Sequence, residues 1–288
     1  MEEFGKVFKI IRESKNMSLK EVAGEYVTPA QLSRFENGKS NLSVDTFFHC
    51  LNNMDVLQGE FFTLYSMYYQ VEDIRLSQEL YKALDSGNIA YFKNKIMEYE
   101  KKYATTNRKS DRLLISVFHV FIYDCDSSYV IPEKEKTNIV DYLLSIDEWC
   151  LYELWILGNC VRSLSTKTLS ILGMELIKHT QFYHNIEENR RRVYRVLLNI
   201  TGELLGRREE KYAIKFIRTL NNLEILEKDL IERLQLKFCK AHLRYLQGFE
   251  DALDIMKECL KMTDFLECYR ISRQIEQTII QLTEITDM

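Results

Sequence analysis

Residues 17–41 constrain what this chain can fold into, because they carry closely spaced start and stop signals for helices. Ser18 and Glu21 have the spacing of a capping box, which satisfies backbone amides that a helix start leaves free. A short helix is therefore expected to begin near Leu19. Gly24 then interrupts the apolar pattern, so we expect this helix to end there.

The same stretch holds the signals of a second short helix. Thr28 is a favourable N-cap residue, and Pro29 takes the first helical position, where its missing N–H costs nothing. Asn37-Gly38 ends the helix, since glycine tolerates the left-handed conformation common at a helix C-terminus. The sequence therefore predicts a helix over 29–36. Two short helices joined by a tight turn form a helix-turn-helix, whose second helix can lie in the major groove of DNA.

The second helix separates apolar from hydrogen-bonding side chains. Leu32 and Phe35 lie on one side and are expected to pack inward, which leaves Gln31 and Arg34 pointing away. Arginine can donate to guanine O6 and N7, and glutamine can pair with adenine N6 and N7. Gln31 and Arg34 are therefore the predicted base-reading residues, and Ala30 is expected to contact a thymine methyl group.

Other polar residues near this helix suit phosphate oxygens, which set the register on DNA without reading its sequence. Two of them, Arg12 and Lys15, come from the helix that precedes the helix-turn-helix. The others lie on its second helix or follow it. The alternative is an ordinary helical hairpin with a surface arginine. The complete set of predicted DNA-contacting residues is Arg12, Lys15, Thr28, Ala30, Gln31, Ser33, Arg34, Asn37, Lys39 and Ser40.

The segments LKEVA and QLSRFENGKSNLS resemble the lambda-repressor-like (XRE) helix-turn-helix at nearly every patterned position. The ending Glu36-Asn37-Gly38-Lys39 matches that family particularly well. The resemblance implies that the side chains at positions 30, 31 and 34 face the DNA groove. Resemblance and side-chain chemistry thus point to the same residues.

Glycine and proline are scarce after residue 59. The chain has two prolines and ten glycines in 288 residues, and four of the glycines fall within the first 59. Helix-favouring residues such as Leu, Glu, Lys and Ile dominate the remainder. The composition therefore predicts an all-α protein. The pattern predicts helices over 4–14, 45–53, 61–69, 72–86, 89–104, 110–124, 133–146, 148–164, 166–182, 187–206, 208–220, 229–247, 249–262 and 264–283.

Antiparallel helix pairs repeating every 35 to 42 residues or so are typical of a right-handed superhelical array of the tetratricopeptide type. We therefore expect two domains. Residues 1–66 form a helix-turn-helix DNA-binding domain, and residues 67–288 form a helical-repeat domain for ligand sensing and dimerisation.

The charge balance differs between the whole chain and its start. The net charge is −4, which is unusual for a nucleic-acid binder, since phosphate contacts supply much of the affinity. Between Gly5 and Asn41, seven basic residues face four acidic ones, a balance of +3. This modest footprint predicts that two copies bind together, as a homodimer on an inverted repeat in promoter DNA.

The sequence gives no support for other classes of function. Seven scattered cysteines without a Cys-x-x-Cys pair favour free thiols in a reducing cytoplasm. A charged N-terminus and the lack of an uncharged run of about 18 residues argue against a signal peptide and a membrane span. His49-Cys50 and Cys239 with His242 lack a second pair at metal-ligand spacing. With no nucleotide-binding or hydrolase motif present, we expect no enzymatic activity, cofactor or metal.

Two predicted inner helices carry a polar stripe away from their apolar side. Asn159 and Asn199 lie 40 residues apart, and each has an arginine nearby on its stripe. A carboxamide can donate to a backbone C=O and accept from a backbone N–H, so a ladder of them can hold an extended peptide. Gly202 leaves room for a ligand side chain. A solvated charged face is the alternative, and Trp155 also fits a core position.

The arginines are expected to bind peptide carboxylates, and helix 229–247 is expected to add an aliphatic floor with basic edges. The predicted peptide-binding residues are Tyr152, Trp155, Asn159, Arg162, Arg192, Arg195, Asn199, Arg233, Leu236, Lys240 and Leu243.

Over its full length the chain resembles the Rgg/GadR/MutR family of transcriptional regulators from Gram-positive bacteria. The resemblance is strongest in QLSRFENGKSNLS, with weaker echoes in Leu157-Gly158-Asn159 and Val196-Leu197-Leu198-Asn199. It implies a cytoplasmic homodimer whose repeat domain binds a short peptide pheromone in its concave face, as in quorum sensing. The residues alone leave two alternatives open: a regulator with a small-molecule effector, a protein effector or none, and a helical-repeat interaction scaffold.

Overall fold

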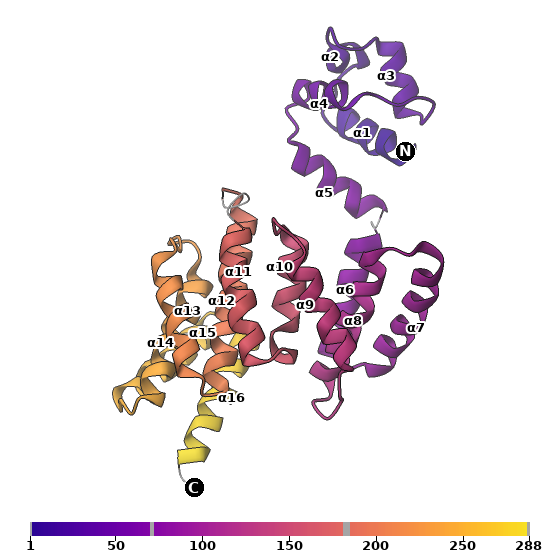
Figure 1. Cartoon of the computed structure of the whole chain (residues 1–288). Helices are drawn as coiled ribbons and strands as arrows, with labels where there is room; N and C mark the ends of the chain where they lie inside the picture. Colours follow the sequence, from indigo (N-terminus) through magenta and orange to yellow (C-terminus); the bar gives the residue numbers. More distant parts are fainter. Residues whose placement is uncertain (1, 70–71, 181–184, 287–288) are drawn as a thin grey trace. The chain divides into compact units, whose positions relative to one another are not determined.

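The computed structural model describes residues 2–69, 72–180 and 185–286, and all the regular structure within these ranges is helical (Figure 1). The expected all-α class is therefore confirmed. The chain divides into two compact units, Met1–Ser86 and Gly87–Met288.

The N-terminal unit contains a small helical core. Helix α1 packs against α3 and α5, and α2 packs against α3 and α4. Its centre is aromatic, with Phe8, Phe35 and Phe61 all buried. The helices are α1 (Glu2–Ser14), α2 (Leu19–Ala23), α3 (Pro29–Glu36), α4 (Val44–Asn53), α5 (Gln58–Tyr69) and α6 (Glu72–Asp85).

Gly5 lets α1 approach the end of α3 closely. A Cβ atom at this position would lie 2.0 Å from the backbone oxygen of Phe35, far inside contact distance. Because a backbone oxygen cannot swing away as a long side chain can, any larger residue at Gly5 would push the two helices apart.

The expected domain boundary between residues 66 and 67 falls inside helix α5, which runs without interruption from Gln58 to Tyr69. The compact unit ends later, at Ser86, and includes α6. The apolar stretch 61–69 predicts a helix that bridges into the next domain. In the structure, however, α5 begins earlier and packs on α1 with Phe61 buried, so it belongs to the N-terminal core.

The second unit is a succession of helix pairs (Figure 1). Within it, α8 packs on α10, α10 on α12, and α12 on α14, so the second helices of these successive pairs contact one another. The pairs are α7 (Ile89–Thr106) with α8 (Lys109–Cys125), α9 (Glu133–Leu144) with α10 (Leu151–Cys160), α11 (Thr166–His179) with α12 (Glu187–Gly206), α13 (Glu210–Asn222) with α14 (Leu230–Leu246), and α15 (Asp251–Phe265) with α16 (Tyr269–Thr286).

Two helices begin three or more residues later than the sequence predicted. Helix α10 begins at Leu151 rather than at 148, because Glu153 accepts a hydrogen bond from the backbone N–H of Cys150 and so caps the start. It ends in a short 3-10 turn, η1 (Val161–Ser163). Helix α16 begins at Tyr269 rather than at 264, because α15 continues to Phe265 and Glu267 then adopts a left-handed conformation. The predicted end of the helix over 166–182 lies outside the described residues.

Candidate functional site

The helix-turn-helix forms as its local signals predict. The hydroxyl of Ser18 accepts from the N–H of Glu21, and the Glu21 carboxylate accepts from the N–H of Ser18, which completes the capping box. The Thr28 hydroxyl accepts from the N–H of Gln31 at 3.2 Å and starts α3. Gly38 takes a φ of 70°, the left-handed conformation expected at the helix end.

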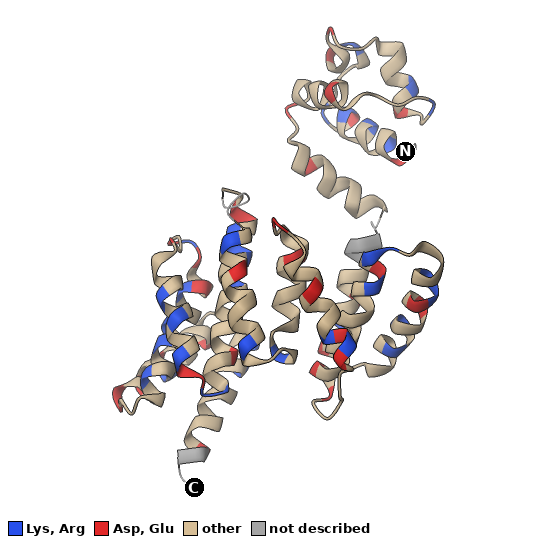
Figure 2. Ribbon diagram, viewed as in Figure 1, with Lys and Arg blue, Asp and Glu red and all other residues tan. Residues whose placement is uncertain are grey.

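Helix α3 exposes the side that the sequence assigned to DNA. Leu32 is fully buried and Phe35 nearly so, whereas Ala30, Gln31 and Arg34 are exposed. Lys and Arg residues also lie along α1 and at the end of α3 (Figure 2). The predicted base-reading side chains therefore share one accessible face.

Arg12 does not take the place expected of a phosphate contact. Its Nε donates to the Glu36 carboxylate at 2.7 Å, and a terminal nitrogen donates to the backbone oxygen of Met17 at 2.8 Å. Only 11% of the Arg12 side chain and 2% of the Glu36 side chain are exposed. Arg12 thus ties α1 to the last turn of α3, and the pair raises the pKa of the guanidinium.

The remaining predicted phosphate contacts differ in how free they are. Lys39 is exposed, and Lys15 is exposed while donating to the backbone oxygen of Asp55 at 3.3 Å. The Asn37 side chain donates to the backbone oxygen of Ser33 at 2.7 Å. Ser40 does not fit the prediction, because its hydroxyl oxygen is buried without a partner among the described residues. Its burial reflects the fold of the loop after α3, which the sequence pattern does not reveal.

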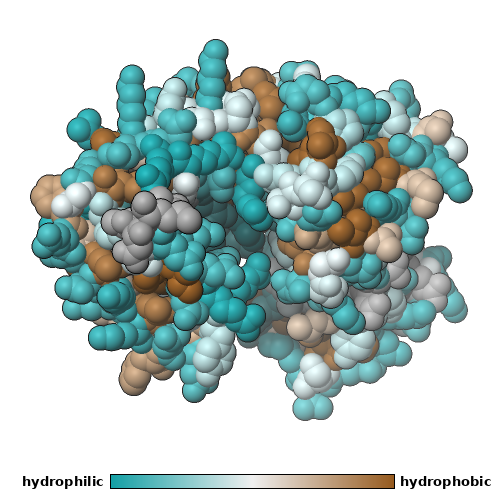
Figure 3. Space-filling model, turned by 90° about the horizontal axis from the view of Figure 1, so that it is seen from below, coloured by the Kyte–Doolittle hydropathy of each residue, from teal (hydrophilic) through white to brown (hydrophobic). Residues whose placement is uncertain are grey.

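The second unit contains a cavity of about 500 Å³. Its walls come from the second helix of each pair, α8, α10, α12, α14 and α16, together with η1. Seen from below, the surface is hollowed and its visible walls are mainly hydrophilic (Figure 3). A volume of this size lies within the range of ordinary ligand sites.

Three of the predicted peptide-binding residues line this cavity: Asn159, Arg162 and Asn199. Gly202 lines it too, and a Cβ atom there would meet nothing within 4 Å, so the expected space is present. The Asn159 amide donates to the backbone oxygen of Trp155 at 2.7 Å. The Asn199 side chain has no partner among the described residues.

The other predicted peptide contacts are absent from the cavity walls, namely Tyr152, Trp155, Arg192, Arg195, Arg233, Leu236, Lys240 and Leu243. Arg195 donates to Glu232 at 2.7 Å, and Arg233 donates to the backbone oxygens of Ile225 and Leu226. Leu236 is buried. Helix α14 is therefore rotated relative to the prediction, since its apolar residues spread around the helix and leave the choice of inner face to packing.

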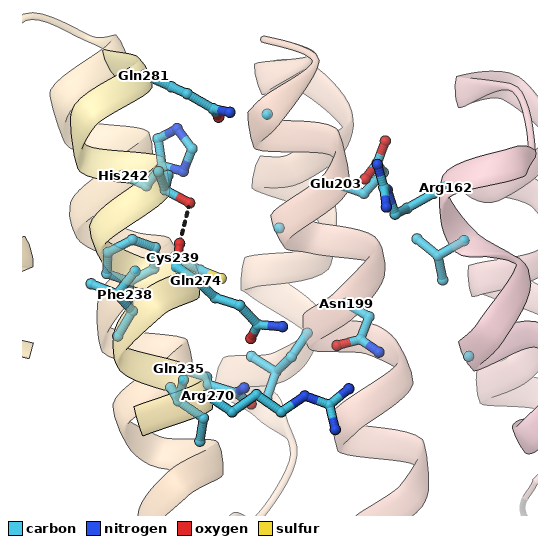
Figure 4. Close-up of a pocket in the computed structure, with 18 of the residues that line it drawn as sticks. Arg162, Asn199, Glu203, Gln235, Phe238, Cys239, His242, Arg270, Gln274 and Gln281 are labelled. Atoms are coloured by element: carbon cyan, nitrogen blue, oxygen red, sulfur yellow. Dashed lines mark hydrogen bonds between the residues drawn. The ribbon is translucent and has the colours of Figure 1, made fainter. Parts of the chain in front are cut away.

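The sequence pattern did not reveal the walls formed by α8 and α16, or the face that α14 turns toward the cavity. Helix α14 presents Gln235, Phe238, Cys239 and His242, and α16 adds a wall that includes Arg270 and Gln274 (Figure 4). Asp124 lines the cavity from the end of α8. The signal that could have found these residues was a polar stripe on an inner helix, the pattern that identified Asn159 and Asn199. It would have had to be followed along the helices before and after those two.

Burial perturbs two titratable groups in the cavity. Burial raises the pKa of Asp124 to about 6, although Arg162, whose guanidinium lies 3.4 Å away, lowers it. Burial lowers the pKa of His242 to about 4, so its imidazole is neutral at pH 7. The Nε2 atom of His242 is buried without a hydrogen-bond partner among the described residues.

Two other features are absent from the described parts of the chain. No group of His, Cys, Asp and Glu side chains there is arranged to hold a metal ion. None of the helices there combines the length and the apolar character needed to cross a bilayer.

Comparison with known proteins matches both units. Residues 93–277 match the model of the C-terminal domain of the HTH-type transcriptional regulator Rgg, and residues 8–56 match a helix-turn-helix model. The SHP pheromone receptor Rgg2 of Streptococcus dysgalactiae is 20% identical, with a TM-score of 0.81 over 96% of this chain and 99% of that chain. The PrgX/cCF10 complex is 14% identical, with a TM-score of 0.76 over 99% of this chain and 93% of that chain.

At these identities the two solved structures show a common fold. The family model carries the assignment further, because it covers well over half of the residues and includes four of the five helices that line the cavity, with the first half of α16. The helix-turn-helix model over residues 8–56 confirms the resemblance noted in QLSRFENGKSNLS. This chain belongs to the Rgg family of HTH-type transcriptional regulators.

Proposed function

We propose that this regulator controls transcription in the cytoplasm in response to a short peptide bound in the cavity of its second unit. The main support for this proposal is the cavity, which is built from the second helix of every pair. Two of the structural relatives support this choice of ligand, since one is a pheromone receptor and the other is a complex of PrgX with cCF10.

The chemistry of the walls suits a peptide backbone. The carboxamides of Asn199, Gln235 and Gln274 face the cavity, and none has a hydrogen-bond partner among the described residues (Figure 4). Each can donate to a backbone carbonyl and accept from a backbone N–H at the same time. Phe238 and Ile275 supply apolar surface beside them.

DNA recognition rests on α3 in this proposal. Gln31 and Arg34 read base edges, Ala30 contacts a thymine methyl, and Lys39 and Lys15 bind phosphates. Arg12 supports α3 from within the core. Binding of the peptide changes the affinity or the geometry of the regulator on promoter DNA.

The test replaces Gly202, because a larger side chain at this position would extend into the cavity. Duplexes bound by the pure protein are selected from a random-sequence pool, and their shift is measured with and without a pool of synthetic octapeptides. Gly202→Phe is expected to fold and to shift DNA normally, because nothing lies within 4 Å of a Cβ at this position. Its response to the peptides is expected to be lost, because the ring occupies the cavity.

Gly202→Ala is the matched control, since one methyl group leaves most of the volume open. A Gly202→Phe protein that still responds to the peptides with unchanged affinity would remove the cavity from the proposal. Wild-type protein that binds DNA but ignores every peptide would favour a small-molecule or protein effector instead.

A further inference from the structure

Unpaired positive charge is unevenly distributed around the cavity. At one end, Arg162 pairs with Asp124 at 3.4 Å. Nearby, Glu203 accepts from Arg207 at 2.8 Å. Both carboxylates at this end are therefore already matched by an arginine, so this end offers a ligand little net charge.

Arg270 is different. It lines the cavity from the first turn of α16, it is exposed, and no carboxylate among the described residues lies within ion-pair distance of it. Its side chain extends from α16 toward α12, the helix that carries Asn199 (Figure 4). A guanidinium held in a concave site without an acidic partner is suited to a carboxylate supplied from outside.

The surroundings of Arg270 can hold a backbone that leads away from such a carboxylate. Gln235 lies beside Arg270, and Gln274 lies one helical turn further along α16 (Figure 4). Asn199 faces them from α12. These three carboxamides are placed to pair with the peptide groups next to the bound carboxylate.

The end of the cavity that lies away from Arg270 offers neutral groups. His242 lies there with Gln281, away from Arg270 (Figure 4). His242 is 3% exposed, and its Nε2 lacks a partner among the described residues. A buried nitrogen of this kind favours a ligand group that forms a hydrogen bond without carrying charge.

We propose that Arg270 sets the direction of the bound peptide by pairing with its single carboxylate, so that the chain runs from α16 along α12 toward a neutral end at His242. This inference rests on the proposed function. Arg270 thereby takes the role of carboxylate anchor that the sequence pattern assigned to Arg192 and Arg195.

The test uses three pools of random octapeptides made from uncharged residues, acetylated at the N-terminus. The neutral pool is amidated at its C-terminus, the anionic pool has a free C-terminal carboxylate or one Glu, and the cationic pool is amidated and has one Lys. Peptides retained by the full-length protein are identified by mass spectrometry, and the dissociation constant of the best anionic peptide is measured. Wild-type protein is expected to enrich the anionic pool.

Arg270→Gln is expected to weaken that peptide about 10- to 100-fold, since a hydrogen-bonded charge is lost, and to bring it level with its neutral counterpart. Arg270→Glu is expected to shift enrichment to the cationic pool. Arg273→Gln is the control, because Arg273 is exposed on the same helix but does not line the cavity. Circular dichroism melts check that all three variants fold.

Two results separate this inference from the proposed function. If wild-type protein retains peptides but Arg270→Gln binds the anionic peptide as tightly as before, the anchor is wrong and the peptide-binding function stands. If no pool is retained by wild-type protein, the proposed function fails and the inference fails with it.

Discussion

Arg34 and Arg12 differ in what their guanidinium groups contact. Arg34 is exposed on α3 and makes no ion pair among the described residues, so it is free to reach a base edge. Arg12 is enclosed by Glu36 and by the backbone oxygen of Met17. The same residue type is thus available to DNA in one place and committed to a buried ion pair in the other.

Arg34→Ala is expected to cost about 1–3 kcal/mol on the preferred DNA site and to relax base preference at one position in each half-site. Lys39→Ala is expected to weaken preferred and random DNA alike, because a phosphate contact carries no sequence information. Binding of both duplex types by both variants checks the assignment. Equal losses on both duplexes for Arg34→Ala would contradict it.

Arg12→Ala is expected to destabilise the N-terminal unit by about 3–5 kcal/mol, because it leaves the buried Glu36 carboxylate without its partner. Replacing both residues, as Arg12→Met with Glu36→Leu, is expected to restore most of the loss. Thermal melts of the three proteins by circular dichroism provide the measurement. An Arg12→Ala protein that melts normally but binds random DNA weakly would restore the phosphate-contact interpretation.

Asp124 gives the second unit a pH dependence. Its pKa of about 6 in the folded chain lies above its ordinary value of 3.8. Between these values the folded state holds a proton that the unfolded state has lost, so stability falls as pH rises through this window. The charged groups that act on Asp124 are Arg162, which favours the ionised form, and Glu203, which opposes it.

Asp124→Asn removes this titration. The difference in free energy of unfolding, variant minus wild type, is expected to rise by up to about 3 kcal/mol between pH 3.5 and pH 7. Urea titrations followed by tryptophan fluorescence report on this unit, since both tryptophans, Trp149 and Trp155, lie within it. A difference that stays constant with pH would show that Asp124 titrates normally.

At the scale of elements, helices α12 and α14 are held together by ion pairs outside the cavity. Arg191 pairs with Asp229 and Arg195 with Glu232, both at 2.7 Å. Both carboxylates are buried, at 3% and 2% exposed, whereas the arginines are partly exposed. These arginines therefore set the spacing of two cavity walls without lining the cavity.

Arg195→Ala is expected to lower the free energy of unfolding by about 1–3 kcal/mol, because Glu232 is left buried without its donor. The affinity of a bound peptide is expected to change little. Asn199→Ala, one turn further along α12, is expected to do the reverse: normal melting, and an affinity reduced about 5- to 100-fold. Calorimetry with a retained peptide and denaturant titrations separate the two roles, and a reversed pattern would place Arg195 in the site.

At the scale of the whole molecule, the chain forms two compact units, and the proposed function assigns DNA to the first and a peptide to the second. The local charge of +3 around the helix-turn-helix sits in a chain with a net charge of −4. A single copy therefore has a small electrostatic footprint for DNA. Tight binding is expected to come from two copies acting together.

We predict a two-fold dimer that reads an inverted repeat, with half-site centres about one helical turn, roughly 34 Å, or a multiple of it apart. Sedimentation at micromolar concentration and footprinting on the selected DNA provide the measurements. A monomer that protects a single half-site would contradict the prediction. Dimerisation without DNA, combined with protection of two half-sites, is the expected result.

The sequence by itself determined the features that depend on neighbours within about one helical turn. The helix-turn-helix follows from local sequence signals. The side chains of Ser18 and Thr28 cap amides three residues further on, and Gly38 adopts the left-handed conformation that ends a helix. The inward side of α3 follows from the spacing of Leu32 and Phe35. Asn159 and Asn199 were found in the same way, from a polar stripe on a regular helix.

Tertiary structure decided what depends on partners far along the chain. Arg12 meets Glu36 across 24 residues, and Arg195 meets Glu232 across 37, and no spacing rule connects such pairs. The inner face of α14 and the wall formed by α16 depend on how each helix rotates as it packs, because apolar residues spread around a helix allow more than one orientation. Packing therefore placed Arg270 and His242 in the cavity and kept Arg233 and Leu236 out of it.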